Sequence, residues 1–363
     1  MRRPTLLIAL CLLSAALACA GTLFLPAYPS SVIVVDEGTG KIVDRIPLET
    51  GTPLGLQLSS DHKRVYVGTV DHNGIEVIDV ATHKVINHVV LNTGDKQYRF
   101  MTGTPDPSGK YFYTVTKEIT KFPEHFEVGK PKYTVVDLDQ KKIVKLVDIP
   151  KEEESTNQLD WGVGWMAVSP DGKYIYQFGK KITILQASDF KVVDHIDLAK
   201  PDAPGMENVH FGGDLDLFNE PGEHTSLFVS SDPIVHNRVF GLARFNLATK
   251  EMDFKPIGPA PAGMAGLEVT PDKKEAYTIV VNGIHGTKRC EFWAFDLASD
   301  RITQKEEVPC RTRFTLGISA DGKKLYIYGA GYQIEVYDTA TLKLEKVWDL
   351  NVDVAMGGIA VLQ

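Results

Sequence analysis

The stretch SADGKKLYI at residues 319–327 combines a tight turn with the start of a strand, and versions of it recur along the chain. Its Asp-Gly pair favours a turn, while the Leu, Tyr and Ile that follow favour a pleated strand. Similar turns stand at residues 59–63, 169–173 and 270–274, with a looser copy at residues 106–110. An apolar run with an aromatic residue follows each turn at once. The sequence therefore predicts a series of β-hairpins.

A second marker is a strand that ends in Asp, or in a residue at the same place, before a short turn that usually carries Thr or Lys. Its seven copies end at Asp36, Asp79, Asp137, Ala187, Asn246, Asp296 and Asp338, 42 to 59 residues apart. A period of roughly 40 to 50 residues with four strands per unit is typical of a β-propeller. The fold class predicted is all-β.

The first marker also indicates how the ring closes. It has five copies, and residues 219–222 stand in for a sixth. The missing seventh would fall between the last strand, residues 358–362, and the first, residues 22–25. A ring whose last strand pairs beside its first explains this gap and leaves no free sheet edge. We therefore predict that residues 21–363 form a seven-bladed β-propeller closed by pairing of the N- and C-terminal strands, with a closing blade from residues 22–48 plus 357–362.

Composition narrows the classes of protein. The 363 residues are 43% hydrophobic and 24% charged, with a formal net charge of −8, or −10 once a leader carrying Arg2 and Arg3 is removed. This is ordinary globular composition, which argues against disorder, coiled coil or a disulfide-dense miniprotein. An acidic chain is a poor non-specific ligand for nucleic acid.

The first 20 residues, MRRPTLLIALCLLSAALACA, have two Arg, an apolar run and small residues at the end. This pattern predicts a signal peptide and a periplasmic or secreted protein. The run from Leu6 to Leu13 is shorter than the roughly 20 residues that span a bilayer, so we do not expect a transmembrane segment. Two processing routes stay open: cleavage after Ala20, or lipoprotein processing with a lipid on Cys19.

Cleavage after Ala20 leaves two cysteines, Cys290 and Cys310, on either side of one predicted hairpin. Folding that hairpin brings Cys290 near residue 307, so an oxidising compartment favours a disulfide. Two free buried thiols are the alternative. Two cysteines without further Cys or His partners do not make a four-ligand metal site.

The longer connections fall on one face of the predicted propeller. The first and third connections of each blade are the short turn markers, whereas the second connections and the crossings between blades lie on the opposite face. The long segments are residues 117–132, 150–162, 199–207, 231–238 and 282–289. Long loops on a rigid scaffold commonly carry binding and catalysis, so we expect function on this face.

The candidate contacts on this face are Arg99, Asp160, Trp161, Trp165, His236, Arg313 and Tyr332. Arg99 and Arg313 stand just before an innermost strand, where they could hold an acidic partner or ligand. If the two arginines only form surface salt bridges, they would contribute little to the stability of the protein. Trp161 and Trp165 either line the central channel or pack between blades.

The sequence predicts no catalytic residue and no metal site. The histidines His72, His125, His236 and His285 fall in four different blades, without a paired motif. A nucleophile elbow, a phosphate loop and a Cys-x-x-Cys-His haem motif are missing from the sequence.

The repeat units, such as residues 74–85, resemble the YVTN propeller repeat of many secreted bacterial proteins. A narrower resemblance is to the β subunit of quinohemoprotein amine dehydrogenase. It rests on the Arg-led strand and hairpin from Arg99-Phe100-Met101 to Tyr113 and on the Lys-Pro step in residues 130–133. It also rests on the fourth-blade segments 214–218, 223–227 and 242–245.

This resemblance implies a periplasmic subunit without a cofactor of its own. It would cradle a small subunit holding cysteine tryptophylquinone and a dihaem cytochrome subunit holding haem c, in an enzyme that oxidises primary amines. One alternative is a free-standing YVTN propeller that acts as a periplasmic binding or interaction module. A minor alternative is a propeller hydrolase such as a lactonase.

Overall fold

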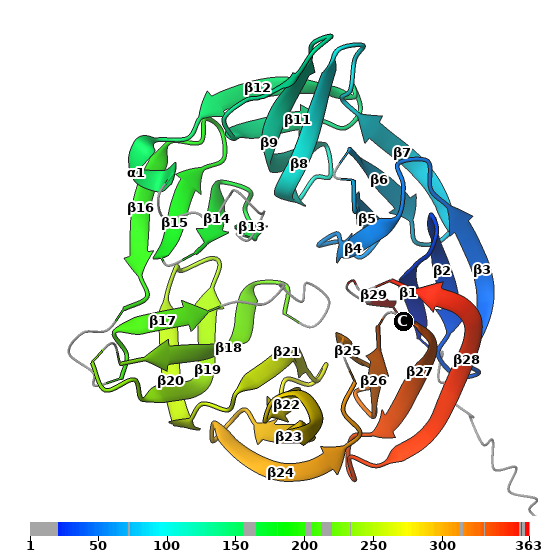
Figure 1. The fold of residues 1–363 in the computed structure, drawn as a ribbon, viewed down its shortest axis with the longest axis vertical. Helices are drawn as coiled ribbons and strands as arrows, with labels where there is room; N and C mark the ends of the chain where they lie inside the picture. The colour runs from blue at the N-terminus through cyan, green and yellow to red at the C-terminus, as the bar shows by residue number, and fades with distance from the viewer. Residues whose placement is uncertain are drawn as a thin grey trace, which may run out of the picture.

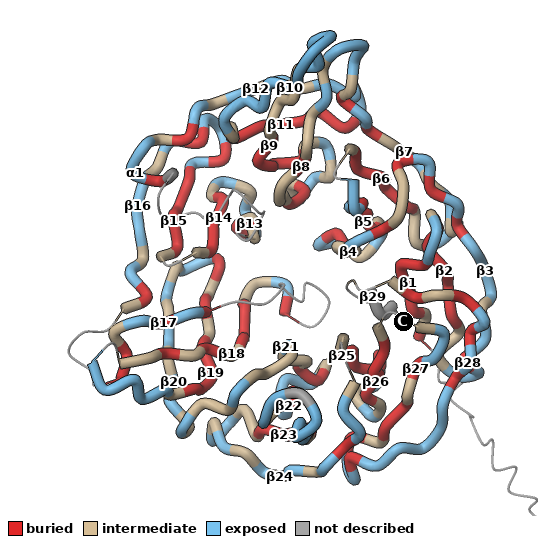
Figure 2. Tube along the Cα trace, in the orientation of Figure 1, coloured by how far each residue is buried: buried red, intermediate tan, exposed pale blue. Residues whose placement is uncertain are grey.

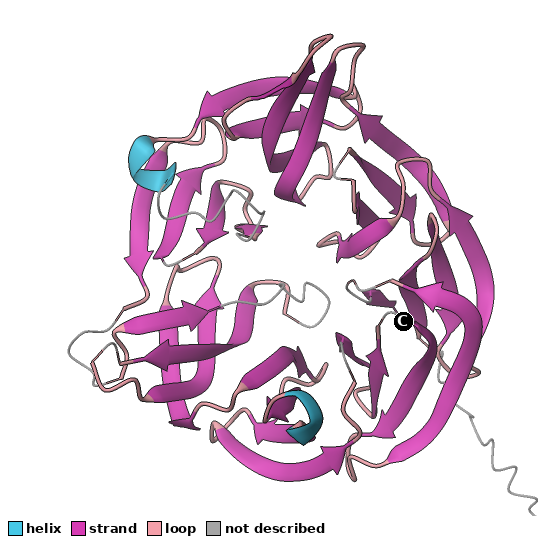
Figure 3. Cartoon of the chain, viewed as in Figure 1, coloured by secondary structure: helices cyan, strands magenta, loops and turns pink. Residues whose placement is uncertain are grey.

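The computed structural model describes residues 21–71, 73–154, 165–179, 181–199, 205–211, 220–232, 234–311, 315–329, 331–355, 357 and 360–362. Short antiparallel strands radiate around a common axis, so the chain is an all-β propeller (Figure 1). Helical structure in these residues is confined to one turn, α1 (Lys151–Glu154), and a 3-10 turn, η1 (His285–Thr287) (Figure 3). Within the same residues, no helix has the length and apolarity to cross a membrane. The predicted signal peptide and Cys19 lie outside them.

The strands of the first half are β1 (Thr22–Ala27), β2 (Ser31–Asp36), β3 (Lys41–Pro47), β4 (Pro53–Leu58), β5 (Arg64–Thr69), β6 (Gly74–Asp79), β7 (Lys84–Val90), β8 (Lys96–Pro105), β9 (Tyr111–Lys121), β10 (Phe126–Val128), β11 (Lys132–Asp137), β12 (Lys142–Asp148), β13 (Met166–Val168), β14 (Tyr174–Phe178), β15 (Lys181–Gln186) and β16 (Val192–Asp197). Those of the second half are β17 (Asn208–Phe211), β18 (Glu223–Ser231), β19 (Arg238–Asn246), β20 (Met252–Pro259), β21 (Gly263–Val269), β22 (Glu275–Asn282), β23 (Arg289–Asp296), β24 (Arg301–Val308), β25 (Thr315–Ile318), β26 (Lys324–Tyr328), β27 (Gly331–Asp338), β28 (Leu344–Val354) and β29 (Ala360–Leu362).

The described strands form six hydrogen-bonded sheets. Five are separate blades: the four-stranded sheets β4–β7, β13–β16, β17–β20 and β21–β24, and the five-stranded sheet β8–β12. The sixth is an eight-stranded sheet in the order β25-β26-β27-β28-β1-β2-β3, with β29 beside β1. The structure thus has five separate blades and one merged sheet where the sequence predicts seven blades. The sheets merge because β28 continues to Val354, which pairs with Ala27 of β1.

The two ends of the chain meet in this merged sheet. Strand β29 pairs with β1 at three positions, from Thr22 opposite Leu362 to Phe24 opposite Ala360. Backbone hydrogen bonds also run from Tyr28 N to the Asp353 carbonyl (2.8 Å) and from Ala355 N to the Pro26 carbonyl (2.8 Å). The N-terminal strand β1 therefore lies between β2 on one side and the C-terminal segments β28 and β29 on the other.

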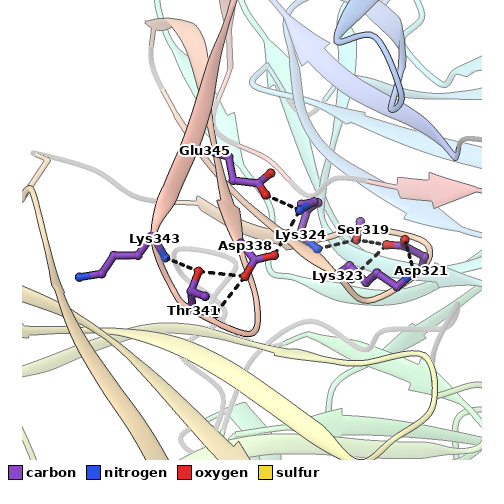
Figure 4. A network of polar contacts seen from close by, with 8 residues as sticks. All are labelled: Ser319, Asp321, Lys323, Lys324, Asp338, Thr341, Lys343 and Glu345. Atoms are coloured by element: carbon purple, nitrogen blue, oxygen red, sulfur yellow. Dashed lines mark hydrogen bonds and ion pairs between the residues drawn. The ribbon is translucent and has the colours of Figure 1, made fainter.

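The recurring sequence marker folds as a turn that is held by its own side chains (Figure 4). The Ser319 hydroxyl donates to Asp321 (2.8 Å), Lys323 N donates to the same Asp321 oxygen (3.0 Å), and Lys324 N donates to Ser319 Oγ (2.8 Å). Gly322 takes the left-handed conformation that the turn requires, with φ 72°. The turns at residues 59–64, 169–174 and 270–275 repeat these bonds.

The second sequence marker is also a self-contained turn. Asp338 accepts hydrogen bonds from Thr341 N (3.0 Å) and from the Thr341 hydroxyl (2.9 Å). Lys324 Nζ reaches Asp338 (3.3 Å) and Glu345 (2.7 Å), which joins the two kinds of turn within one blade (Figure 4). Because the side chain stops the strand and caps the turn together, Asp is favoured at this position.

The apolar core lies between neighbouring sheets, and the outermost strands face solvent (Figure 2). One cluster joins β14 and β15 to β18 and β19 through Tyr176, Ile184, Phe228 and Phe245, all fully buried. By contrast, the outer strand β12 alternates exposed and half-buried residues along its length. The core is therefore a ring of contacts between blades.

A buried polar contact joins the last sequence repeat to the first. The Tyr326 hydroxyl on β26 donates to Glu37 Oε1 (2.5 Å), just after β2, and Ala320 N donates to the same oxygen (3.2 Å). Burial raises the pKa of the Glu37 carboxyl, although the two hydrogen bonds oppose this shift. Glu37 therefore holds its proton more tightly in the folded state, so its contribution to stability falls as pH rises from about 4.5 through the folded pKa.

We predict that Glu37→Gln gains stability relative to the natural chain as pH rises above about 4.5, until the natural carboxyl is ionised in the folded state. The amide oxygen still accepts from Tyr326 but carries no charge that burial penalises. Tyr326→Phe, which leaves the buried carboxylate short of a donor, is expected to cost about 1–3 kcal/mol at neutral pH. Urea unfolding across this pH range measures both, and a stability difference for Glu37→Gln that does not change with pH would contradict the assignment.

The predicted disulfide is confirmed. Cys290 and Cys310 are bonded, with Cα atoms 5.2 Å apart. Cys290 lies on β23 opposite Val308, the last residue of β24, so the hairpin places Cys310 two residues beyond the partner of Cys290. The bond fixes the start of the crossing that leads to β25.

Replacing both cysteines, Cys290→Ser with Cys310→Ser, is expected to lower the free energy of unfolding by about 3 kcal/mol, because the unfolded chain loses its cross-link. Denaturant unfolding of both proteins with and without dithiothreitol measures this. The reductant should shift the natural chain to the midpoint of the double variant and leave the variant unchanged. Equal midpoints for the two oxidised proteins would refute it.

Candidate functional site

The two faces of the propeller differ in their exposed apolar side chains. The described large apolar residues that are at least 59% exposed are Tyr28, Phe126, Val128, Ile234, Val235, Ile284 and Tyr332. All seven lie in second connections or next to one. The opposite face carries the polar turns described above. The face on which the sequence predicts function is therefore the face that carries these exposed apolar side chains.

The most prominent feature of this face is an arm, defined here as residues 96–100 and 117–128. It is formed by the outer ends of β8 and β9 together with β10, and it projects from the ring in Figure 1. Strand β9 is flanked on both sides: Ile119 lies opposite Gln97 of β8 and also opposite Val128 of β10. The predicted long excursion after Lys117 is thus mostly β-sheet.

A polar network stiffens the arm. Glu118 accepts hydrogen bonds from Lys96 Nζ (2.7 Å) and from the Tyr98 hydroxyl (2.7 Å). These two bonds hold the pKa of the Glu118 carboxyl below its usual value, so the group is ionised at neutral pH. At the tip, the rings of Phe122 and His125 stack with centroids 4.8 Å apart. The arm is therefore ordered although Phe126 and Val128 are more than 60% exposed.

The structure places the described candidates on separate sheets. Arg99 lies inside β8, opposite Lys117, and not before the strand as the sequence suggests. His236 is exposed at the end of the turn between β18 and β19, where it has a positive φ of 59°. Tyr332 is 59% exposed near the start of β27. Asp160, Trp161 and Arg313 lie outside the described residues, so their roles stay predictions.

Trp165 packs in an aromatic cluster just before β13. Its ring stacks on Phe178 with centroids 3.7 Å apart and meets the His224 ring edge-on at 4.5 Å. Phe211 lies against the other side of His224, at 5.0 Å. These contacts correspond to the packing alternative for Trp165, while half-burial leaves part of its ring accessible.

The sequence gives no signal for the buried His224 in this cluster. Neither of its ring nitrogens, nor Trp165 Nε1, has a hydrogen-bond partner in the structure. Burial alone lowers the pKa of His224 to about 3, so the ring is neutral at physiological pH. Its contribution to stability is complete above the unfolded pKa of 6.5 and is lost as pH falls towards 3. His224 is a buried polar group held in an apolar cage.

A second unpredicted group is the fully buried carboxylate of Glu153 in α1. It accepts from the Thr183 hydroxyl (2.8 Å), contacts His195 Nε2 (2.7 Å) and pairs with Lys181 Nζ (3.1 Å). These bonds outweigh burial and keep the pKa of Glu153 below its usual value. Because Thr183, Lys181 and His195 lie on β15 or β16, these bonds anchor the connection that follows β12 to the next blade.

Across the residues that the structure describes, no three His, Cys, Asp or Glu side chains converge in a way that could hold a metal ion. Of the four histidines named from the sequence, His125 and His236 are exposed and lie on different sheets. His72 and the side chain of His285 lie outside the described part of the chain.

No protein-family model matches the chain, and no curated protein matches it. Solved structures do. A functionally unknown protein from Desulfotomaculum acetoxidans is 12% identical, with a TM-score of 0.57 over 95% of this chain and 99% of that one. Apo AztD from Citrobacter koseri is 13% identical, with a TM-score of 0.54 over 95% and 98%. The dihydro-heme d1 dehydrogenase NirN is 12% identical, with a TM-score of 0.53 over 94% and 75%.

These neighbours are propeller-type proteins of unrelated function. At 12–13% identity the likeness extends to the fold and no further. A match to the β subunit of quinohemoprotein amine dehydrogenase is not among the similar structures named here. Function must therefore be argued from sites on the fold.

We predict that His224→Phe stabilises the protein increasingly as pH falls below about 6.5. Phe fills the aromatic cage without unpartnered nitrogens, and it removes a group that must stay neutral. The advantage over the natural chain should grow by up to about 1.4 kcal/mol per pH unit between about pH 6 and pH 4. Thermal unfolding over this range measures it, with His210→Gln, a substitution of an exposed histidine on β17, as control. Parallel pH profiles for all three proteins would contradict the assignment.

Proposed function

We propose that the chain is a non-catalytic scaffold subunit of a periplasmic oxidoreductase that resembles quinohemoprotein amine dehydrogenase. Its partners would be a small subunit holding cysteine tryptophylquinone and a dihaem cytochrome subunit holding haem c. The observation that carries this proposal is the arm, whose open strand edge and exposed apolar side chains suit a partner polypeptide. The sequence resemblance in residues 99–113 and 130–133, which border and include parts of this arm, supports it.

The edge of β10 explains why the arm suits a protein partner. Among the residues that the structure describes, β10 is the last strand of its sheet, so one side of its backbone has no strand neighbour there. Proteins usually protect such an edge with charges or coverage, but here Phe126 and Val128 face solvent beside it. An extended partner segment that adds to β10 would pair its backbone and cover both side chains.

The same proposal includes the domain organisation. We infer that the eight-stranded sheet corresponds to two blades, β25–β28 and the closing blade of residues 22–48 plus 357–362, which makes seven in all. The pairing of β1 with β29 and the contact of Tyr326 with Glu37 support this closure. Residues 1–20 would be the signal peptide, and the disulfide suits the oxidising periplasm.

Affinity purification of the tagged chain from the periplasm of its own host tests the proposal. The expected result is a complex that contains a haem-staining protein and a small quinone-staining chain. Isolation of the chain as a stable monomer, without either protein, would overturn it and favour the free-standing binding module.

Two arm substitutions test the contact itself. Phe126→Asp with Val128→Asp is expected to reduce recovery of the partners at least tenfold, because burying two new carboxylates at an interface is costly. Val43→Asp is the control, since Val43 is 58% exposed on the outer strand β3. If the arm variant keeps its partners, the complex stands but the arm is not its contact.

A further inference from the structure

Two connections of neighbouring sheets present three strongly exposed aliphatic side chains, including the two most exposed of the described chain, Ile234 and Ile284. Ile234 and Val235, between β18 and β19, are 84% and 60% exposed. Ile284, between β22 and β23, is 71% exposed. Three exposed cations stand beside them: Arg238, Lys288 and Arg289. We call these six residues the tip patch.

The two connections belong to neighbouring sheets and are linked at their bases. The short crossing from β20 to β21 touches the base of both: Ala260 N donates to the Arg238 carbonyl (2.9 Å), and Ala262 N donates to Asn282 Oδ1 (3.4 Å). Arg238 begins β19 and Asn282 ends β22. The aliphatic tips and the cations therefore belong to one surface, with the apolar Ala-Pro-Ala crossing between them.

Both tips are held rigidly outwards. Asp232 Oδ1 accepts from Ile234 N (2.7 Å) and Val235 N (3.0 Å), which fixes the first turn. In the second, the Thr287 hydroxyl donates to the Ile284 carbonyl (2.8 Å), and Thr287 N donates to the same oxygen (3.0 Å). The aliphatic side chains are thus presented to solvent by ordered turns.

The charge of this surface is opposite to that of the chain. Residues 232–238 and 282–289 contain three Lys or Arg and a single acid, Asp232, in a protein of net charge −8. The Asp232 carboxylate is occupied by the turn. Within these two segments the cations therefore outnumber the acid by three to one, and salt screens charges farther away than about 8–10 Å.

We propose that the tip patch docks the propeller onto an anionic lipid surface, with the aliphatic tips among the headgroups and the cations at the lipid phosphates. Projecting aliphatic tips ringed by Lys and Arg suit a fluid bilayer, which needs no matching pocket. Protein interfaces depend more on aromatic and Arg anchors seated in pockets, and Val and Leu are under-represented among their main contacts. The proposal does not rest on the proposed function, because no arm residue belongs to the patch.

Vesicle co-sedimentation of the full processed chain tests this inference. The probes are vesicles of phosphatidylcholine alone and of phosphatidylcholine mixed with phosphatidylglycerol. Binding is expected only to the mixed vesicles and should weaken as salt is raised. All variants are compared in the same processed form, so that a lipid on Cys19 would contribute equally to each.

Two variants of the tip patch separate the contributions of its cations and of its aliphatic side chains to vesicle binding. Replacing the three cations with Gln should lower the partition coefficient about fivefold per charge. Replacing the three aliphatic tips with Ser should lower it at least tenfold. Matched controls are Lys63, Lys173 and Lys323→Gln on the opposite face, and Val43→Ser with Ile86→Ser on the outer strands. Circular dichroism confirms that each variant is folded.

Failure of the natural chain to bind the mixed vesicles, or equal binding by the patch and control variants, would overturn the proposal. Loss of the partner proteins instead of the vesicles in the patch variants would also overturn it, since the patch would then be a protein interface. An intact complex that does not bind vesicles leaves the scaffold function standing, which keeps the two proposals distinguishable.

Discussion

The propeller depends on side-chain contacts between blades, because the backbone hydrogen bonds of a separate blade run only within its own sheet. A buried tyrosine at the same place in the second strand supplies two such contacts, through Tyr176 and Tyr326. The Tyr176 hydroxyl donates to the Leu247 carbonyl in the next blade (2.6 Å), and Tyr326 reaches Glu37 in the same way. Each hydroxyl satisfies a polar group in a turn of the neighbouring sequence repeat, so the repeats can pack closely without leaving that group unpaired.

A second recurring contact ties the incoming crossing to the sheet in three of the repeats. The third strand carries a polar residue three places before its end: Glu76 accepts from Glu49 N (2.8 Å) and Thr50 N (2.7 Å), and Thr183 donates to Glu153. At the same place in β27, Glu335 pairs with Arg311. The kinds of hydrogen bond or ion pair differ, while the position of the polar residue in the third strand is the same. The crossings can therefore vary in sequence and still be held to the sheet.

The sequence predicts well those features whose hydrogen bonds are local. Ser319, Asp321 and Lys324 span six residues, so the turn can be recognised from the chain alone, and the Cys290–Cys310 bond follows from one hairpin. The merging of the first and last sheets depends on Ala27 meeting Val354, which no local pattern encodes. His224 was missed for the same reason, since its cage comes from residues far apart in the chain.

The two faces of the propeller differ because short turns capped by their own side chains connect the strands on one face, and longer, more variable connections lie on the other. On the turn-marker face, carboxylates such as Asp171 and Asp338 are occupied by their own turns, so they have little capacity left for a ligand. On the other face the connections can lengthen without disturbing these short turns. The arm and the tip patch both lie on that face. Their apolar side chains stay exposed in the described chain, and exposed apolar patches are typical of surfaces that meet another protein or a membrane. Because the self-capped turns fix the connections of one face, variation in length and sequence is concentrated on the other face, where we propose the contacts with partners.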